Sequence, residues 1–265
     1  MDIQLLEKRF ALIGARVKLE IIPATTWRSR PGIDIGRDKS GEFFDIKIAS
    51  GDEVNYEIVD LQKDLRHLLL MARREESKEK FLCGHDERHW FVCAVPGTGV
   101  ANVENAMEAL QPTFVRWQVS RKIKRHKNRF ERRNEAFTRQ GEWFFVPFPE
   151  LVFNAKQIHK NEPISRGFGS KPHVCEEVFR NRGESVMVCI YYPSGVSIKQ
   201  YNAILKQNPK ANRWNWQMRQ INASVYARGA VRHPDHKTIY LDGWHQVFMN
   251  TEREAPGMRH VVFLD

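Results

Sequence analysis

Histidines gathered around a predicted turn are the first residues of this chain that could do chemistry. His233 and His236 flank Pro234-Asp235, and His245 follows on the next strand-like stretch, with Arg228 and Arg232 just upstream. Histidine changes charge near neutral pH, so it can take or give a proton during a reaction. This group therefore predicts acid–base chemistry, with local hydrogen bonding within the turn as the alternative.

A second candidate is the stretch from Ser165 to His173, which combines two glycines, two hydroxyls, two cations and a histidine. Its backbone N–H groups could form a nest for an anion such as phosphate. The spacing matches neither a Walker A loop nor a GxGxxG turn, so no nucleotide cofactor is expected. The alternative is a plain surface loop.

Together these two regions could cleave RNA without a metal ion. Such cleavage needs a base for the 2′-hydroxyl proton, an acid for the leaving oxygen and a cation on the phosphate. The roles require that the loop and the hairpin meet in space. The predicted catalytic residues are His173, His233, His236, His245, Arg166 and Lys171.

Two metal sites are also considered, and neither is favoured over the metal-independent histidine site. Asp235-His236, Gly243 and Asn250 resemble the Asp-His, Gly and Asn marks of an HNH nuclease, but the residues after Asn250 do not read as the helix of that motif. Cys83, His85, His89 and Cys93 are residue types that zinc prefers, at a spacing unlike the common zinc sites; a buried cross-strand pair of Cys83 and Cys93 is favoured instead. Neither metal nor cofactor is expected.

The remaining clusters of acidic residues do not show the separated, convergent carboxylates that two-metal phosphoryl transfer requires. They are Asp86-Glu87, Glu176-Glu177 and Glu252 to Glu254. Each is expected to be a solvated face.

Basic residues are concentrated in one segment, 116–139, which carries a net charge of +8 out of +10 for the whole chain. A local cationic surface is the footprint of a polyanion, because each cation that neutralises a phosphate releases counterions. The alternatives are a solvated charged face or a contact with an acidic protein. The predicted nucleic-acid-binding residues are Arg116, Arg121, Lys122, Lys124, Arg125, Lys127, Arg129, Arg132, Arg133 and Arg139.

Composition predicts a folded protein with reduced thiols. The chain has 265 residues, of which 42% are hydrophobic, enough for one large domain or two smaller ones. It shows no apolar run long enough for a membrane span and no secretory start, so a cytoplasmic protein without membrane contact is expected. Cys83, Cys93, Cys175 and Cys189 lie in or beside apolar runs, which favours buried free thiols.

Alternating apolar residues predict a hairpin from 42–48 and 54–61, and a second strand pair from 67–71 and 81–95 with a polar turn at 84–88. A short helix is expected after Asn102. Further strands are expected at 142–148 and 185–192, with a loop at 161–172, a helix capped by Ser197, and a final hairpin from 223–231 and 238–249.

These patterns predict an α+β fold with antiparallel sheet, a few helices and a long basic segment. The expected parts are a β-rich region 1–112, the basic segment 113–141 and an α+β region 142–265, which could pack as one body. The predicted function is nucleic-acid binding, RNA ahead of DNA, with a metal-independent histidine nuclease site. The alternatives are a non-catalytic subunit of a nucleoprotein or defence assembly, joined to other protein subunits, and a domain that binds a phosphate or nucleotide ligand.

Overall fold

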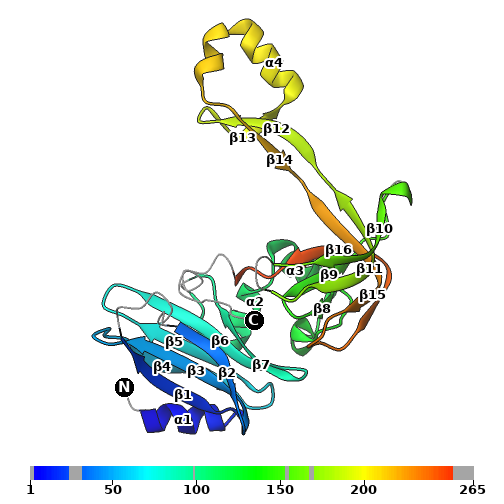
Figure 1. Cartoon of the computed structure of the whole chain (residues 1–265). Helices are drawn as coiled ribbons and strands as arrows, with labels where there is room; N and C mark the ends of the chain where they lie inside the picture. The colour runs from blue at the N-terminus through cyan, green and yellow to red at the C-terminus, as the bar shows by residue number, and fades with distance from the viewer. Residues whose placement is uncertain (1–2, 24–31, 98, 153–154, 167–169, 253–265) are drawn as a thin grey trace.

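The computed structural model describes residues 3–23, 32–97, 99–152, 155–166 and 170–252. Within them are four α-helices and sixteen strands in four sheets, mostly antiparallel. The predicted α+β class is confirmed. Figure 1 shows two bodies of sheet side by side and a slender arm that projects from one of them.

The first body begins with helix α1 (Ile3–Ala11) and two sheets. One sheet has the order β1-β3-β2, from β1 (Val17–Ile22), β2 (Gly32–Asp38) and β3 (Gly41–Ala49). The other is the meander β4-β5-β6-β7, from β4 (Asn55–Gln62), β5 (His67–Arg73), β6 (Lys78–Asp86) and β7 (His89–Ala94).

A shared apolar core holds these two sheets together. Phe44 and Ile46 of β3 belong to the same buried cluster as Leu68 and Leu70 of β5, and Phe10 of α1 closes one end. Phe44 is fully buried, with its ring 5.0 Å from that of Phe10. The alternating apolar residues of β3 therefore face a second sheet.

The hairpin predicted from 42–48 and 54–61 is wrong, although both strands exist. β3 pairs with β1 and β2, whereas β4 pairs with β5, so the turn at Ser50-Gly51 carries the chain from one sheet to the other. Alternation identifies a half-buried strand but not its partner. The second predicted pair is confirmed as β5, β6 and β7, with the β6–β7 turn narrowed to Glu87-Arg88.

Helix α2 (Val103–Ala109) covers the outer face of the meander. Its expected cap is present, because the Asn102 side chain accepts a hydrogen bond from the backbone N–H of Asn105. Val103 and Ala106 pack on Leu69 and Leu82, so β5 is buried on both faces.

The basic segment is not one continuous element. It begins in helix α3 (Thr113–Lys122), passes through the short 3-10 helix η1 (His126–Phe130) and ends in strand β8 (Thr138–Gln140). Val115, Val119 and Ile123 form its buried side, packed against Phe137 and Phe144. The exposed side of the segment carries most of its cations.

The second body is a six-stranded sheet in the order β10-β11-β15-β16-β9-β8. Its further strands are β9 (Trp143–Pro147), β10 (Ile158–Ile164), β11 (His173–Asn181), β15 (Ser224–Arg232) and β16 (Ile239–Met249), and η2 (Ala155–Gln157) precedes β10. The predicted final hairpin is confirmed as β15–β16. The loop expected at 161–172 is partly wrong, because β10 extends to Ile164; its Pro163 is tolerated because β10 is an edge strand.

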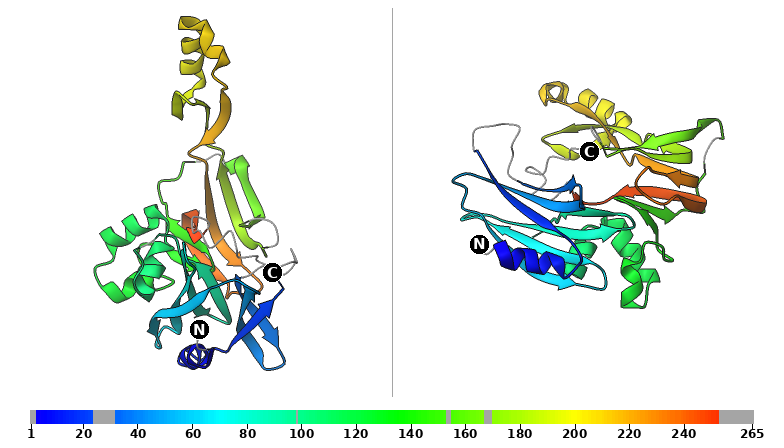
Figure 2. Two further views of the ribbon diagram at one scale, coloured as in Figure 1. Left: turned by 90° about the vertical axis from the view of Figure 1, so that its left-hand side faces the viewer. Right: turned by 60° about the horizontal axis from the view of Figure 1, so that its bottom comes forward.

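An arm leaves this sheet where β11 runs on into β12 (Glu184–Cys189) and returns where β14 (Gln217–Ile221) runs into β15 (Figure 2). Its sheet has the order β13-β12-β14, with β13 at Tyr192–Ser197. Helix α4 (Ile198–Gln207) and η3 (Pro209–Arg213) form the tip. The predicted capping box is confirmed, since Ser197 and Gln200 hydrogen-bond reciprocally.

Candidate functional site

Three of the four candidate catalytic histidines lie together. His173 begins β11, and His233 and His236 lie in the turn between β15 and β16. The ring centroids are 4.2 Å apart for His173 and His233, 4.7 Å for His233 and His236, and 5.6 Å for His173 and His236. We call these three residues the histidine cluster.

Strand pairing explains why segments so distant in sequence meet. β11 and β15 are antiparallel neighbours, and Val174 lies opposite Arg232, so His173 lies beside the start of the following turn. The buried Gln140 amide then donates hydrogen bonds to the carbonyls of Val231 (3.2 Å) and Lys237 (2.7 Å). One side chain thus ties both ends of the turn to β8.

Burial keeps two of the three rings neutral. The pKa of His173 is lowered to about 3 and that of His236 to about 4, mainly by loss of water on burial and in part by the neighbouring His233. Both ring nitrogens of His173 and Nδ1 of His236 are buried without a hydrogen-bond partner in the described part of the chain. The Nδ1 atom of His233 accepts the backbone N–H of Asp235 at 3.1 Å.

Gly141 leaves room for this arrangement. It has φ of +56°, and a Cβ built there would lie 2.8 Å from Nε2 of His236 and 3.2 Å from Nε2 of His173. Two imidazole nitrogens therefore point at one glycine, where any larger residue would press on the rings. Gln140 and Gly141 position the turn and the rings, and the sequence did not point to them because a Gln-Gly pair before a strand reads only as a turn.

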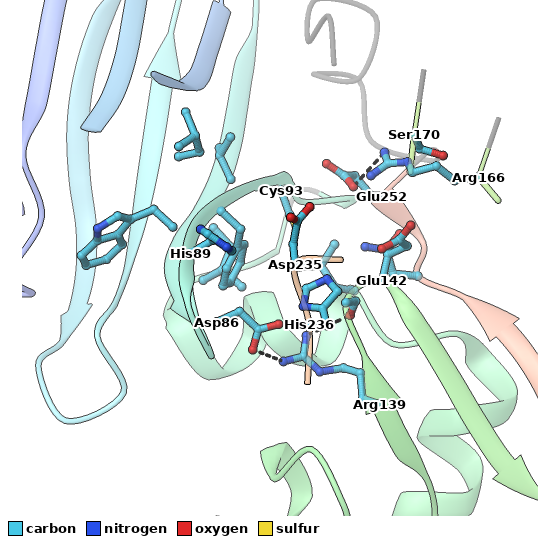
Figure 3. Close-up of a pocket in the computed structure, with 18 of the residues that line it drawn as sticks. Asp86, His89, Cys93, Arg139, Glu142, Arg166, Ser170, Asp235, His236 and Glu252 are labelled. Atoms are coloured by element: carbon cyan, nitrogen blue, oxygen red, sulfur yellow. Dashed lines mark hydrogen bonds and ion pairs between the residues drawn. The ribbon is translucent and has the colours of Figure 1, made fainter. Parts of the chain in front are cut away.

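A cavity of about 530 Å³ lies between the two bodies of sheet, and His233 and His236 line it. Three of the cations on its wall are Arg139, Arg166 and Lys171; Figure 3 labels the two arginines. Each is ion-paired: Arg139 with Asp86 at 3.5 Å, Arg166 with Glu252 at 3.2 Å, and Lys171 with Asp235 at 2.8 Å.

Glu252 joins the two bodies at this cavity. Its side chain is 1% exposed and accepts the backbone N–H of Ala94 at 3.1 Å while it contacts Arg166. Burial raises the pKa of Glu252. The acidic stretch that begins at Glu252 was expected to be solvated; this first member is instead part of the interior.

His245 lies apart from the histidine cluster. It pairs with Ala227 in the middle of the β15–β16 hairpin, and its Nδ1 is 3.0 Å from the carbonyl of Gly243. It does not line the cavity. The structure therefore brings together His173, His233 and His236, places Arg166 and Lys171 on the wall of the adjoining cavity, and leaves His245 apart.

The ten cations of the basic segment divide into two groups. Seven are exposed along α3, η1 and the turn after η1: Arg116, Arg121, Lys122, Lys124, Arg125, Lys127 and Arg133. We call this the α3–η1 face. Arg129, Arg132 and Arg139 are partly buried; Arg132 forms ion pairs with both Asp86 and Glu87. Asp86 and Glu87 are therefore not the solvated face that was expected.

Other sequence-based expectations also change. Cys83 lies opposite Val92, and Cys93 lies opposite Leu82, so the two thiols are one residue out of register and point to opposite faces of the sheet. The predicted cross-strand pair is wrong. Glu176 accepts the backbone N–H of Ala230, and Glu177 pairs with Arg228, so this acidic pair is engaged within the sheet.

The anion nest predicted at 165–173 cannot be followed, because Gly167, Phe168 and Gly169 lie outside the described residues. The HNH resemblance likewise ends at the edge of the described chain: Asn250 lines the cavity and its N–H donates to the carbonyl of Glu142 at 2.9 Å.

Comparison of the chain with models of protein families, with curated proteins and with solved structures finds no significant match. Among the helices in the described residues, none has the length and apolar character needed to cross a bilayer.

His67 on the cavity wall gives a pH test of this buried site. Burial lowers the pKa of His67 to about 4, against about 6.5 in an unfolded chain. The unfolded chain therefore binds a proton that the folded protein excludes, and this contribution to stability, present above pH 6.5, is lost as pH falls toward 4. We expect His67→Gln to flatten the dependence of unfolding free energy on pH by up to about 1.4 kcal/mol per pH unit in that window.

Denaturant unfolding at several pH values measures this slope. His159→Gln, at an exposed position on β10, is the matched control and should keep the wild-type slope. An unchanged slope in His67→Gln would show that His67 is not held neutral by burial.

Proposed function

We propose that this chain binds nucleic acid, RNA ahead of DNA, and cleaves a phosphodiester in the cavity beside the histidine cluster. The observation that carries the proposal is the meeting of His173 with His233 and His236, from segments distant in sequence, at a cavity wall that also holds Arg139, Arg166 and Lys171. Perturbed titratable groups that converge beside a cavity are the usual mark of a reactive site.

The α3–η1 face supports the binding half of the proposal. Its cations are exposed, and the same segment reaches the cavity, which Phe130 of η1 and Phe137 line. A strand that follows these cations would be guided to the cavity mouth. Backbone contacts of this kind give affinity without sequence preference.

The chemistry follows from the state of the imidazoles. A neutral ring can accept the 2′-hydroxyl proton of RNA, after which the 2′ oxygen attacks phosphorus and the bond from phosphorus to the 5′ oxygen breaks. The 5′ oxygen then takes up the proton that the ring accepted, so the same imidazolium is the acid for the leaving group. The low pKa values of His173 and His236 keep both rings neutral at pH 7 and make the imidazolium a strong acid, while they weaken the neutral ring as a base.

The binding half predicts a loss of affinity in the variant Lys122→Ala, Lys124→Ala, Arg125→Ala and Lys127→Ala. All four side chains are exposed on the α3–η1 face. If each contacts a phosphate, the slope of log affinity against log salt should fall by about 3. Titration of a labelled single-stranded RNA at several salt concentrations measures both quantities.

A charge-matched control replaces Lys8, Arg9, Lys39 and Lys63 by Ala, all exposed in the first body. This control should keep most of the affinity and the slope. Equal effects of the two quadruple variants would contradict a specific binding face.

The catalytic half predicts that His236→Ala cleaves RNA at least about a hundredfold more slowly than wild type, the size of a lost acid–base group. RNA binding should be unchanged, because His236 is not on the α3–η1 face. Single-turnover cleavage and a parallel binding titration measure the two effects. His159→Ala is the control; equal cleavage by His236→Ala and wild type would remove the cluster from the reaction.

A second candidate function, a non-catalytic subunit of a nucleoprotein assembly, is favoured by the arm. Of its residues 184–221, only Val186, Cys189 and Ala211 are buried, and Ile190 is 83% exposed. A projection with so small a core is suited to contacts outside its own chain.

The chemistry of the arm tip fits single-stranded nucleic acid. Tyr191 lies 4.6 Å from Trp214, and Tyr192 lies 5.6 Å from Trp216, ring centre to ring centre, with Tyr191 64% exposed. Residues 182–221 hold six cations and one acid. Aromatic faces among cations can stack bases while the cations hold the backbone.

We expect Tyr191→Ala with Trp214→Ala to weaken binding of single-stranded RNA, since each lost stacking contact is worth about 1–3 kcal/mol. Tyr240→Ala is the control, because Tyr240 is 70% exposed on β16, away from the arm. Fluorescence anisotropy with single- and double-stranded RNA measures the change. Loss for the single strand alone supports stacking; no loss would leave the arm without a role in RNA binding.

A further inference from the structure

We infer that His173, His233 and His236 form a binding site for one divalent transition-metal ion, Zn²⁺ before others. The inference stands on the geometry of the histidine cluster and does not require that the protein cleave nucleic acid. The sequence predicted no metal ion at these three histidines.

The donor set is the first argument. Each histidine offers one ring nitrogen such that all three nitrogens lie within 4.8 Å of one another, and within the described residues this is the one such group of at least three His, Cys, Asp or Glu. Tetrahedral Zn²⁺ with bonds of 2.0–2.1 Å places its ligand nitrogens about 3.4 Å apart. The three nitrogens would therefore have to close by at most about 1.4 Å to hold the ion.

Buried ring nitrogens of the histidine cluster also favour a metal ion. Buried polar atoms almost always have a partner, and those that do not call for an explanation. Both ring nitrogens of the 1% exposed His173 and the Nδ1 of His236 lack a hydrogen-bond partner among the described residues. A metal ion held by Nε2 would satisfy one of the two unpartnered nitrogens of His173.

Gly141 supplies the third argument. The Nε2 atoms of His173 and His236 lie 3.2 and 2.8 Å from the position that a Cβ of residue 141 would take. Because Gly141 has no Cβ, residue 141 does not crowd these two nitrogens. An ion bound between the rings would be held by Nε2 of both.

The net charge of the cavity wall also favours a bound cation. Its wall holds four cations, Arg37, Arg139, Arg166 and Lys171, against six carboxylates. The carboxylates are Asp34, Glu42, Asp86, Glu142, Asp235 and Glu252. A wall with more acids than bases attracts a cation, and a bound dication would neutralise the excess negative charge that a phosphate meets.

Three protein ligands are the pattern of catalytic zinc sites, which keep a further position for water or substrate. His233 and His236 line the cavity, so a ligand of the ion could enter from there. Metal binding by Nε2 of His233 places a proton on its Nδ1, which can then no longer accept the N–H of Asp235. Binding of the metal ion should therefore change the conformation of the turn at 233–236.

The test uses the full chain, stripped with a chelator, dialysed and titrated with Zn²⁺ in a calorimeter, with bound metal measured by mass spectrometry. We expect one ion per chain. Co²⁺ in its place should give the visible absorption of tetrahedral cobalt bound by nitrogen.

His173→Ala and His236→Ala should each weaken Zn²⁺ binding at least tenfold, whereas His245→Ala and His159→Ala should bind like wild type. Gly141→Ala should weaken binding with all three histidines intact. Circular dichroism identifies any variant that fails to fold, and the wild-type stoichiometry stands without the variants. No binding by the wild type, or equal binding by the cluster variants and the controls, would overturn the inference; either result leaves RNA binding and cleavage to be judged by their own assays.

Discussion

The burial of imidazole nitrogens away from water is the constraint on which the candidate site depends. An unsatisfied buried polar group costs about 1–3 kcal/mol, and His173 carries two such nitrogens while His236 carries one. The fold maintains this arrangement through Gln140, which holds the turn from both ends, and through Gly141, which leaves the rings room. Natural proteins accept such local violations chiefly at functional sites, where the strained group has a task. A metal ion or a reacting hydroxyl would supply the missing partner.

The cavity exists because the two bodies of sheet meet at a few charged contacts. Arg132 reaches from the basic segment to Asp86 and Glu87 on the β6–β7 turn, Glu252 receives the N–H of Ala94, and the N–H of Lys237 donates to Glu87 at 2.6 Å. These contacts also fix the histidine-bearing turn against the first body. The basic segment thus has two physical roles, since its exposed cations can meet a polyanion while its partly buried cations assemble the cavity. Net charge alone could not separate these roles.

The sequence predicted the positions of helices and strands better than it predicted which strands pair. Alternation and turn residues identify β15 and β16 and the turn with His233 and His236, and the capping patterns identify α2 and α4, because these signals are local. They could not show that β3 and β4 belong to different sheets, because this depends on which faces pack. A register shift of one residue separates Cys83 from Cys93. The convergence of His173 with the turn depends on the long-range pairing of β11 with β15, while His245, on the same hairpin, lies elsewhere.

A measurement of RNA and DNA cleavage tests the proposed function most directly. Wild-type protein, stripped of metal and then supplied with or without Zn²⁺, is incubated with labelled single- and double-stranded RNA and DNA at low and moderate salt. We predict salt-sensitive binding with RNA ahead of DNA, and cleavage of RNA by the metal-stripped protein. Cleavage that stops on metal removal and returns with Zn²⁺ would contradict the proposed metal-independent histidine mechanism. The absence of both binding and cleavage for all four substrates would contradict the proposed function.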